Sequence, residues 1–271
     1  MIINEIHCKS ILNKSGIPSI DYALNPYIGC GHKCQYCYAV FMKRFSGHTE
    51  PWGDFVDAKI NAPEVLERQL KRLKRKSHIS FGTVCDAYQP LEAKYKITRK
   101  CLEKLVPYKH EVSILTKSNL VLRDLDVLKK LKDIEVGFTV TCLDLKVKKI
   151  FEPHAPPAKK RFEALKTLSQ HNIPTWVFVA PTLPYLSDSE EVIGRIFRAA
   201  QHAGAHYILF DTLNPYPKVR NNVTRLIKKY FPNALDFYNY YYYNKTKYER
   251  LLKRKISKIA RRYRIKCRTV F

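Results

Sequence analysis

Two hydrophobic patterns alternate along most of the chain: short apolar runs rich in β-branched residues, and segments in which apolar residues recur every three or four positions. The helical spacing is clear in Leu66, Leu70 and Leu73. Such alternation is typical of βα units that build a parallel sheet. The predicted strands cover residues 22–29, 78–84, 111–115, 135–141, 175–180 and 206–211, and the predicted helices cover residues 62–74, 98–105, 121–131, 158–171, 188–203 and 221–230.

Six βα units are too few to close an eight-stranded barrel. We therefore predict an α/β fold with an open, partial (β/α)6 barrel of the TIM type. The length of 271 residues is compatible with one such domain. Ser187 and Glu190 have the Ser-x-x-Glu spacing of a capping box, which predicts the start of the fifth helix.

The sequence changes character after Pro232. Residues 239–244 are polar and rich in tyrosine, and residues 245–268 hold twelve Lys or Arg against a single acid, Glu249. Helical spacing gives this last stretch an apolar face with a basic back, formed by Leu251, Leu252, Ile256, Ile259 and Tyr263. We predict a core domain over residues 1–231 and a basic, helical C-terminal extension over residues 232–271.

Lys and Arg outnumber Asp and Glu by 49 to 24, which gives a net charge of +25. An excess of this size attracts polyanions such as RNA or DNA. The alternative is a generally lysine-rich composition, with the basic tail merely solvated. No apolar run reaches the roughly 20 residues that cross a bilayer, and the first residues do not resemble a signal peptide. We expect a cytoplasmic protein that does not bind membranes.

Three of the eight cysteines, Cys30, Cys34 and Cys37, lie within eight positions directly after the first predicted strand. Uneven spacing of this kind predicts a metal site in a reducing compartment. Three thiolates can bind three irons of a 4Fe-4S cluster and leave the fourth iron open. Zinc with His32 as fourth ligand is the alternative, although structural zinc usually joins two ligand pairs that are far apart. The remaining cysteines suit packing better.

The motif Cys-x3-Cys-x2-Cys, with an aromatic residue before its last cysteine, resembles the radical S-adenosylmethionine (SAM) superfamily. Further motifs resemble the branch of spore photoproduct lyase, from the start of the chain to about residue 211. These are Asn25 to Ala39, then Phe151, Glu152, Pro153, Pro157 and Arg161, and finally Ala180-Pro181. The resemblance implies a 4Fe-4S cluster, S-adenosylmethionine, and a reductant such as ferredoxin or flavodoxin. Reductive cleavage would give a 5'-deoxyadenosyl radical that abstracts a hydrogen atom from the substrate.

Ligands of parallel barrels bind at the C-terminal strand ends. By resemblance, Lys117 meets the carboxylate of S-adenosylmethionine, Thr139 contacts the cofactor, and Tyr36 lies beside the adenine or shields the cluster. Asp86 follows the second strand and is a candidate for a hydrogen bond to the cofactor's ammonium or ribose.

Cys85 stands where the family usually has a hydroxyl residue. Its thiol could donate a hydrogen atom to a substrate radical, because the S–H bond is weak. The donor cysteine of the lyase aligns nearer Thr83, so a buried packing role or a cofactor contact stays open for Cys85.

Three functions remain open at this point. The first is a radical SAM enzyme that repairs a DNA lesion or modifies an RNA base, since basic residues neutralise phosphates and tyrosines stack on unpaired bases. The second is a radical SAM enzyme that acts on a peptide or small metabolite. The third is a zinc-stabilised nucleic-acid-binding protein without catalysis. The basic tail either grips nucleic acid or closes the open barrel.

Overall fold

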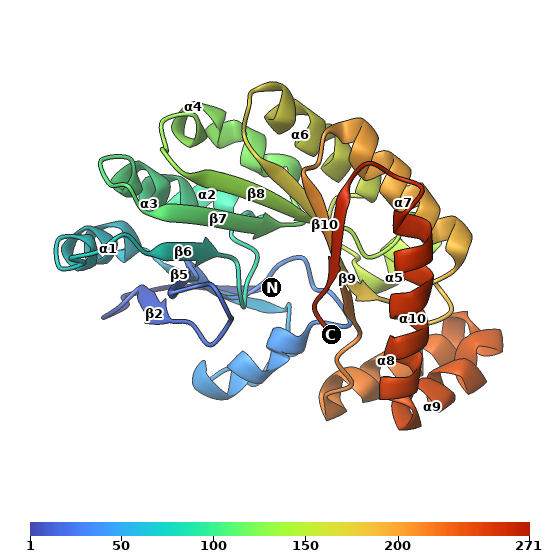
Figure 1. Ribbon diagram of the computed structural model, residues 1–271. Helices are drawn as coiled ribbons and strands as arrows, with labels where there is room; N and C mark the ends of the chain where they lie inside the picture. The colour runs from blue at the N-terminus through green and yellow to red at the C-terminus, as the bar shows by residue number, and fades with distance from the viewer.

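The computed structural model describes all residues 1–271 and contains one large, curved sheet (Figure 1). Its strand order is β11-β10-β9-β8-β7-β6-β3-β2, and every neighbouring pair is parallel except β2 and β3. The strands are β2 (Leu12–Lys14), β3 (Tyr22–Leu24), β6 (His78–Phe81), β7 (Glu111–Thr116), β8 (Ile134–Thr139), β9 (Thr175–Thr182), β10 (Tyr207–Thr212) and β11 (Lys266–Thr269).

Helices cover most of the outer side of this sheet (Figure 1). The helices up to residue 230 are α1 (Ala62–Leu70), α2 (Glu92–Tyr95), α3 (Ile97–Leu105), α4 (Leu125–Leu128), α5 (Leu145–Phe151), α6 (Ala158–Gln170), α7 (Glu190–Ala203) and α8 (Pro217–Tyr230), with the 3-10 turn η2 (Asn119–Asp124) before α4. Helix α8 lies below the sheet in Figure 1, beside the helical segment that follows it. The apolar face of each long helix packs on the apolar strands in one continuous core. The six predicted βα units and the open barrel are confirmed. None of the helices combines the length and the apolar character needed to cross a membrane.

The first predicted strand, residues 22–29, is in fact two strands in different sheets. Only β3 joins the large sheet, whereas β4 (Tyr27–Gly29) pairs antiparallel with β5 (Phe55–Lys59) in a second sheet that also holds β1 (Ile2–Ile6). Pro26 lies at the break and has no N–H for a strand ladder. Its carbonyl accepts a hydrogen bond from the Lys59 backbone N–H at 3.1 Å and thereby contributes to the second sheet.

The predicted capping box of the fifth helix is wrong. Helix α7 begins at Glu190, and its cap is Ser189, whose side chain accepts from the Val192 backbone N–H at 3.1 Å. The Ser187 hydroxyl instead accepts from the Leu183 backbone N–H at 2.8 Å and closes the preceding turn. Both serines precede acidic residues, so local spacing pointed to the wrong one.

The segment after Pro232 forms α9 (Leu235–Tyr243), α10 (Lys245–Ala260) and finally β11 at the edge of the sheet, beside β10. Leu252, Ile256 and Ile259 of α10 are buried in the main core, and Tyr263 stacks on Phe197 of α7 at a centroid distance of 5.2 Å. The segment thus extends the core and covers the last barrel strand. The boundary at residue 231 stays a prediction. Leu251, predicted to lie on the apolar face, is 52% exposed.

Leu251 and Leu252 form a natural matched pair for testing this packing. Leu252→Ala removes a side chain that is 2% exposed and should lower the free energy of unfolding by about 2 to 5 kcal/mol. Leu251→Ala should change it by less than about 0.5 kcal/mol. Urea unfolding followed by circular dichroism measures both. Equal stabilities of the two variants would show that α10 does not pack on the barrel.

Candidate functional site

The three clustered cysteines lie in a loop between β4 and the 3-10 helix η1 (Tyr38–Phe45). The loop bends at Gly29, where φ is +84° and a Cβ atom would collide with the Phe55 carbonyl, so this position requires glycine. The Gly31 backbone N–H donates to the Gln89 side chain at 2.7 Å, and the Cys37 backbone N–H donates to the Cys34 carbonyl at 3.2 Å. The loop is therefore held by the segment that follows β6 and by a hydrogen bond of its own.

The thiols of this loop lie close enough to influence one another. Burial raises the pKa of each, to about 12 for Cys34, while the Lys117 ammonium lowers the pKa of Cys34 and Cys37. A metal centre displaces such protons when it binds. The donor set, three thiols in one partly buried loop beside a fixed cation, therefore fits an anionic iron–sulfur cluster.

A single zinc ion fits this loop poorly. No three His, Cys, Asp or Glu side chains of the protein are arranged to hold one metal ion. His32, the proposed fourth zinc ligand, places its Nε2 atom 3.2 Å from the Asp86 carboxylate. Zinc draws all four ligands to within about 2.3 Å of one point, whereas the three thiolates of a four-iron cluster each bind a different iron. The arrangement favours the cluster.

Asp86 follows β6 at the C-terminal edge of the sheet, and its side chain is 8% exposed. Its carboxylate accepts from the Thr116 hydroxyl at 2.6 Å, the Lys117 backbone N–H at 2.7 Å and the Tyr88 backbone N–H at 2.9 Å. Burial raises its pKa, but His32 and these donors lower it more, and the pKa lies well below the usual range. Asp86 thus ties the end of β6 to the end of β7 and to the cysteine loop.

Lys117, directly after β7, points its half-buried ammonium toward the same loop, with Nζ 5.8 Å from the centre of the Tyr36 ring. Burial lowers the pKa of Lys117, but the Cys34 thiol and the Glu152 carboxylate raise it more, and the net shift is upward. The lysine is therefore charged. Tyr36 and Lys117 lie beside Cys34, and Asp86 lies beside Cys30 and His32 of the same loop.

Tyr36 and Thr139 are connected through a buried ion pair. The Tyr36 hydroxyl donates to Glu152 and lies 2.9 Å from the Thr141 hydroxyl. Arg161 of α6 pairs with Glu152 and donates to the Thr139 carbonyl at 2.8 Å. Burial raises the pKa of Glu152, but Arg161 and Lys117 lower it more, to about 2.

Cys85 directly precedes Asp86 in the chain and is buried. Its thiol is 3.7 Å from the Asn25 side-chain oxygen, which also accepts from the Val84 backbone N–H at 3.0 Å. Burial raises the pKa of the thiol to about 12, so it carries its hydrogen at neutral pH. The Asn25 amide donates to the Thr83 hydroxyl at 2.9 Å, which places Thr83 and Cys85 around the same asparagine.

A sequence model of the radical SAM superfamily matches residues 24–210, more than half of the chain. The chain belongs to the radical SAM superfamily. It is an enzyme of this family and uses a 4Fe-4S cluster and S-adenosylmethionine. The alternative of a zinc protein without catalysis is set aside.

Other radical SAM enzymes and several proteins without an assigned activity are similar to this one. An uncharacterized protein of Methanocaldococcus jannaschii is 35% identical over 260 residues, 96% of this chain and 94% of its own. An uncharacterized protein of Mycobacterium bovis is 27% identical over 97% of this chain and 81% of its own.

Solved structures of radical SAM enzymes share the fold. Spore photoproduct lyase with bound AdoMet and a dinucleoside spore photoproduct superposes with a TM-score of 0.72 at 12% identity, over 99% of this chain and 81% of the lyase chain. SuiB of Streptococcus suis bound to its precursor peptide gives a TM-score of 0.52 at 17% identity, over 78% of this chain and 47% of SuiB.

Sequence reasoning gave no role to Glu152 and Arg161, although both belong to a motif of this radical SAM branch. Each side chain is 1% exposed, and a buried charge requires a partner. The signal was the arginine at position 161, which shares the buried face of α6 with Ala164, Leu165 and Leu168. A charged residue on such a face marks an internal ion pair.

The Glu152–Arg161 pair yields a stability test. Arg161→Gln leaves the Glu152 carboxylate buried without its counter-ion and should lower the free energy of unfolding by about 3 to 5 kcal/mol. The control is Lys258→Gln, which breaks the exposed pair with Glu190 and should have little effect. Urea unfolding under anaerobic conditions measures both variants. Wild-type stability of Arg161→Gln would contradict the role given to this pair.

Proposed function

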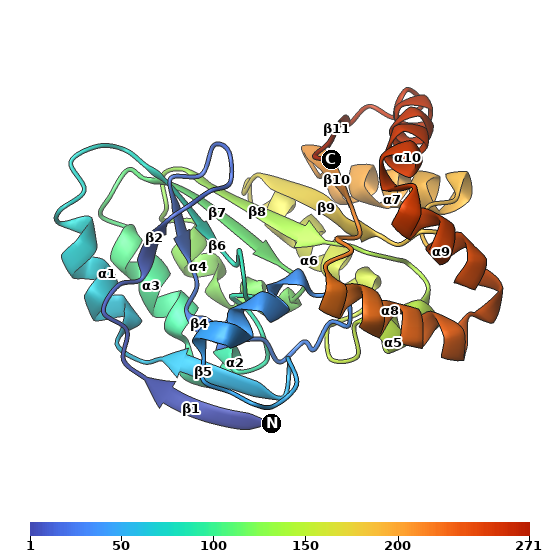
Figure 2. The same cartoon turned by 90° about the horizontal axis from the view of Figure 1, so that it is seen from below.

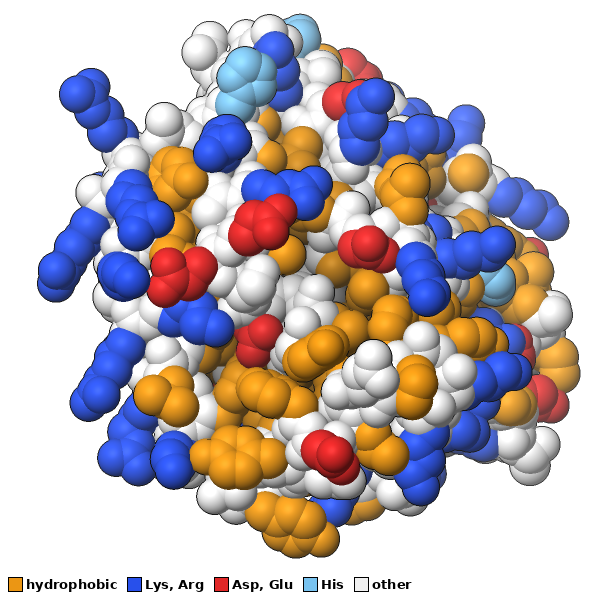
Figure 3. All heavy atoms as spheres, turned by 90° about the vertical axis from the view of Figure 1, so that its right-hand side faces the viewer, with side chains coloured by type: hydrophobic (Ala, Val, Ile, Leu, Met, Phe, Trp, Pro, Cys, Tyr) orange, Lys and Arg blue, Asp and Glu red, His pale blue; other side chains and the backbone are white.

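We propose that this radical SAM enzyme acts on a nucleic acid, either repairing a DNA lesion or modifying a base in RNA. The observation that carries the proposal is the excess of positive charge, +25, on a barrel with the fold of spore photoproduct lyase. Figure 3 shows Lys and Arg side chains mainly along the sides of one face, with several Asp and Glu and a hydrophobic area between them. Basic side chains bind polyanions through their phosphates.

The three loop cysteines, Cys30, Cys34 and Cys37, are proposed as the cluster ligands. When bound, the cluster supplies the electron that cleaves S-adenosylmethionine into methionine and a 5'-deoxyadenosyl radical. Lys117 provides a fixed ammonium for the carboxylate of the methionine moiety, and Thr139 lies at the end of the next strand. The Tyr36 ring, held by Glu152 and Thr141, forms a rigid wall for the adenine.

We propose that Asp86 forms a hydrogen bond to the ammonium or ribose of S-adenosylmethionine. An ionised carboxylate has about four acceptor positions, and three of them accept from the Tyr88 N–H, the Thr116 hydroxyl and the Lys117 N–H. His32 Nε2 lies 3.2 Å away without a hydrogen bond to it. The same carboxylate also fixes the Lys117 backbone.

Cys85 is proposed as a hydrogen-atom donor to the substrate radical, because its buried thiol stays protonated. The free cysteines suit a reducing, cytoplasmic environment. The electron for the cluster would come from a reductant such as ferredoxin or flavodoxin.

A peptide or small metabolite is the second candidate substrate. Its support is the fold shared with SuiB, whose structure holds a precursor peptide. The excess of basic residues favours nucleic acid over this alternative.

Isotope transfer tests the substrate class. Reconstituted enzyme is incubated anaerobically with reductant, S-adenosylmethionine and deuterated cellular RNA, damaged DNA or a peptide digest. Deuterium should appear in 5'-deoxyadenosine from one of the two nucleic-acid pools. Deuterium from the peptide pool alone would contradict a nucleic-acid substrate and support a peptide substrate instead.

The ligand assignment predicts a clear pattern of iron loss. Changing Cys30, Cys34 or Cys37 to Ala should remove the cluster and abolish 5'-deoxyadenosine formation, because each thiolate binds its own iron. Cys8→Ala, which lies outside the loop, should keep the wild-type iron content. Iron analysis and the visible absorption of anaerobic protein measure this. Full iron in any loop variant would remove that cysteine from the ligand set.

The cofactor assignment predicts weaker binding with an intact cluster. Lys117→Ala and Thr139→Ala should each weaken S-adenosylmethionine binding by about ten- to a hundredfold, the value of a hydrogen bond to a charged group. Lys109→Ala removes an exposed lysine before the opposite end of β7 and is the control. Equilibrium binding to the reconstituted enzyme measures the effect. Unchanged affinity in both site variants would show that these strand ends do not contact the cofactor.

A further inference from the structure

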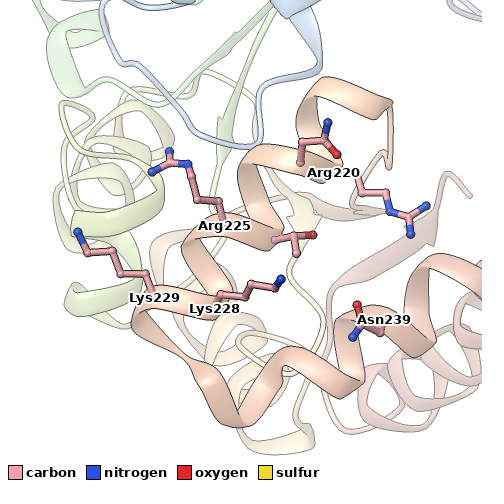
Figure 4. A pocket seen from close by; sticks show the side chains of 7 residues that line it. Arg220, Arg225, Lys228, Lys229 and Asn239 are labelled. Carbon is pink, nitrogen blue, oxygen red and sulfur yellow. The ribbon is translucent and has the colours of Figure 1, made fainter.

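Helix α8 and the following α9 border an open groove of about 710 Å³ that no acidic or hydrophobic residue lines. Its basic residues are Arg220, Arg225, Lys228 and Lys229 of α8. In Figure 4, Arg220 and Lys228 extend toward Asn239 of α9, and Arg225 and Lys229 extend from the same helix on the other side. The opposite face of α8 is buried, and most of its polar face lines the groove.

These four charges are uncompensated. None of the four forms an ion pair, and the only side-chain partner of Arg225 is the amide oxygen of Asn222 at 2.7 Å. On α10, Lys245 pairs with Glu249 at 3.0 Å and Lys258 pairs with Glu190 at 3.3 Å, whereas Arg250, Lys253 and Arg254 form no ion pair and border no groove with α8. Unpaired cations that line one groove attract an anionic ligand more strongly than cations that already have partners.

Aromatic side chains form one edge of the groove. The Arg220 guanidinium lies 4.7 Å from the centre of the Tyr242 ring and 5.3 Å from that of Tyr243. Tyr243, the last residue of α9, is 78% exposed. A free aromatic face beside an arginine is the arrangement on which unpaired bases stack.

Helix α8, which lines the groove, also contacts the cysteine loop. The Asn222 side chain of α8 donates to the backbone carbonyl of Gln35 at 2.7 Å and to its side-chain oxygen at 3.0 Å. Gln35 is the residue between Cys34 and Tyr36. Phe231, at the end of α8, stacks on Phe151, the neighbour of Glu152, at 6.4 Å. Figure 2 shows α8 beside η1, which follows directly after Cys37. A ligand bound along α8 is therefore close to the cysteine loop at the open end of the barrel.

We propose that this groove binds the backbone of a single-stranded nucleic acid and directs one of its bases to the cluster. The inference rests on the proposed function and locates its substrate. Arg225, Lys228 and Lys229 contact successive phosphates, since Arg225 and Lys229 are about 6 Å apart along the helix axis. Arg220 and Tyr243 stack on a base. Residues 245–268, the basic tail predicted to bind nucleic acid, then have a mainly structural role.

A matched pair of triple variants tests this placement. Arg225→Gln, Lys228→Gln and Lys229→Gln together remove three exposed charges from the groove. Arg250→Gln, Lys253→Gln and Arg254→Gln remove three exposed charges from α10. The groove variant should bind a labelled single-stranded oligonucleotide at least about tenfold more weakly, with the slope of log affinity against log salt reduced by about 0.7 per lost phosphate contact. The α10 variant should keep nearly wild-type affinity and slope.

Each other outcome overturns a defined part of the account. Equal losses in the two variants would show an effect of net charge and reject the groove, while the proposed function stands. Wild-type protein that binds no oligonucleotide and takes no deuterium from nucleic acid would reject the proposed function itself. A groove variant with normal oligonucleotide binding but slow reduction of its cluster by an acidic electron-transfer protein would assign the groove to the reductant.

Tyr243 provides a second test that does not alter charge. Tyr243→Ala removes an exposed ring, leaves the core intact and should weaken oligonucleotide binding by about five- to a hundredfold. Tyr243→Phe keeps the stacking face and should bind like wild type. Iron content and uncoupled cleavage of S-adenosylmethionine should be normal in both. Full affinity of Tyr243→Ala would reject the stacking contact and, together with an unaffected triple variant, the groove.

Discussion

A carboxylate buried inside a barrel requires positive charge and hydrogen-bond donors around it, and Glu152 obtains them from three parts of the chain. Arg161 comes from α6, the Tyr36 hydroxyl from the cysteine loop, and Lys117 from the end of β7. Tyr36 lies between two of the proposed cluster ligands, so the ion pair orients the loop as well as the strand ends. The geometry of the site therefore depends on this one buried charge, and the adjacent Asp86 secures the opposite side of the same loop.

Positive charge has two separate uses in this enzyme. Inside the barrel, Lys117 and Arg161 compensate buried carboxylates and lie beside thiols that become thiolates when a cluster binds. On the surface, α8 exposes cations that no acid compensates. The net charge of +25 does not distinguish these uses, since electrostatic attraction to a polyanion depends on where unpaired charge gathers.

The sequence predicted the parts of the fold that local patterns determine. Helical spacing, as in Leu66 and Leu70, and the alternation of strands with helices predicted the six βα units. The three cysteines and the neighbouring glycines predicted the cluster loop. The break at Pro26 was missed because apolar residues continue on both sides of it, and the cap at Ser189 was missed because Ser187 has the Ser-x-x-Glu spacing. Side-chain contacts between residues that are far apart in the sequence could not be predicted either. The pairing of Glu152 with Tyr36 spans 116 positions, and the contact of Asn222 with Gln35 spans 187, so only the folded chain reveals them.

Electron paramagnetic resonance of the reduced protein with isotopically labelled S-adenosylmethionine tests the central claim most directly. Anaerobically prepared enzyme should contain about four irons per chain, with one iron free of protein ligands. The amino nitrogen of 15N-labelled S-adenosylmethionine should then show hyperfine coupling to the reduced cluster. One zinc per chain, or a reduced cluster whose spectrum does not change when the labelled cofactor is added, would contradict the account.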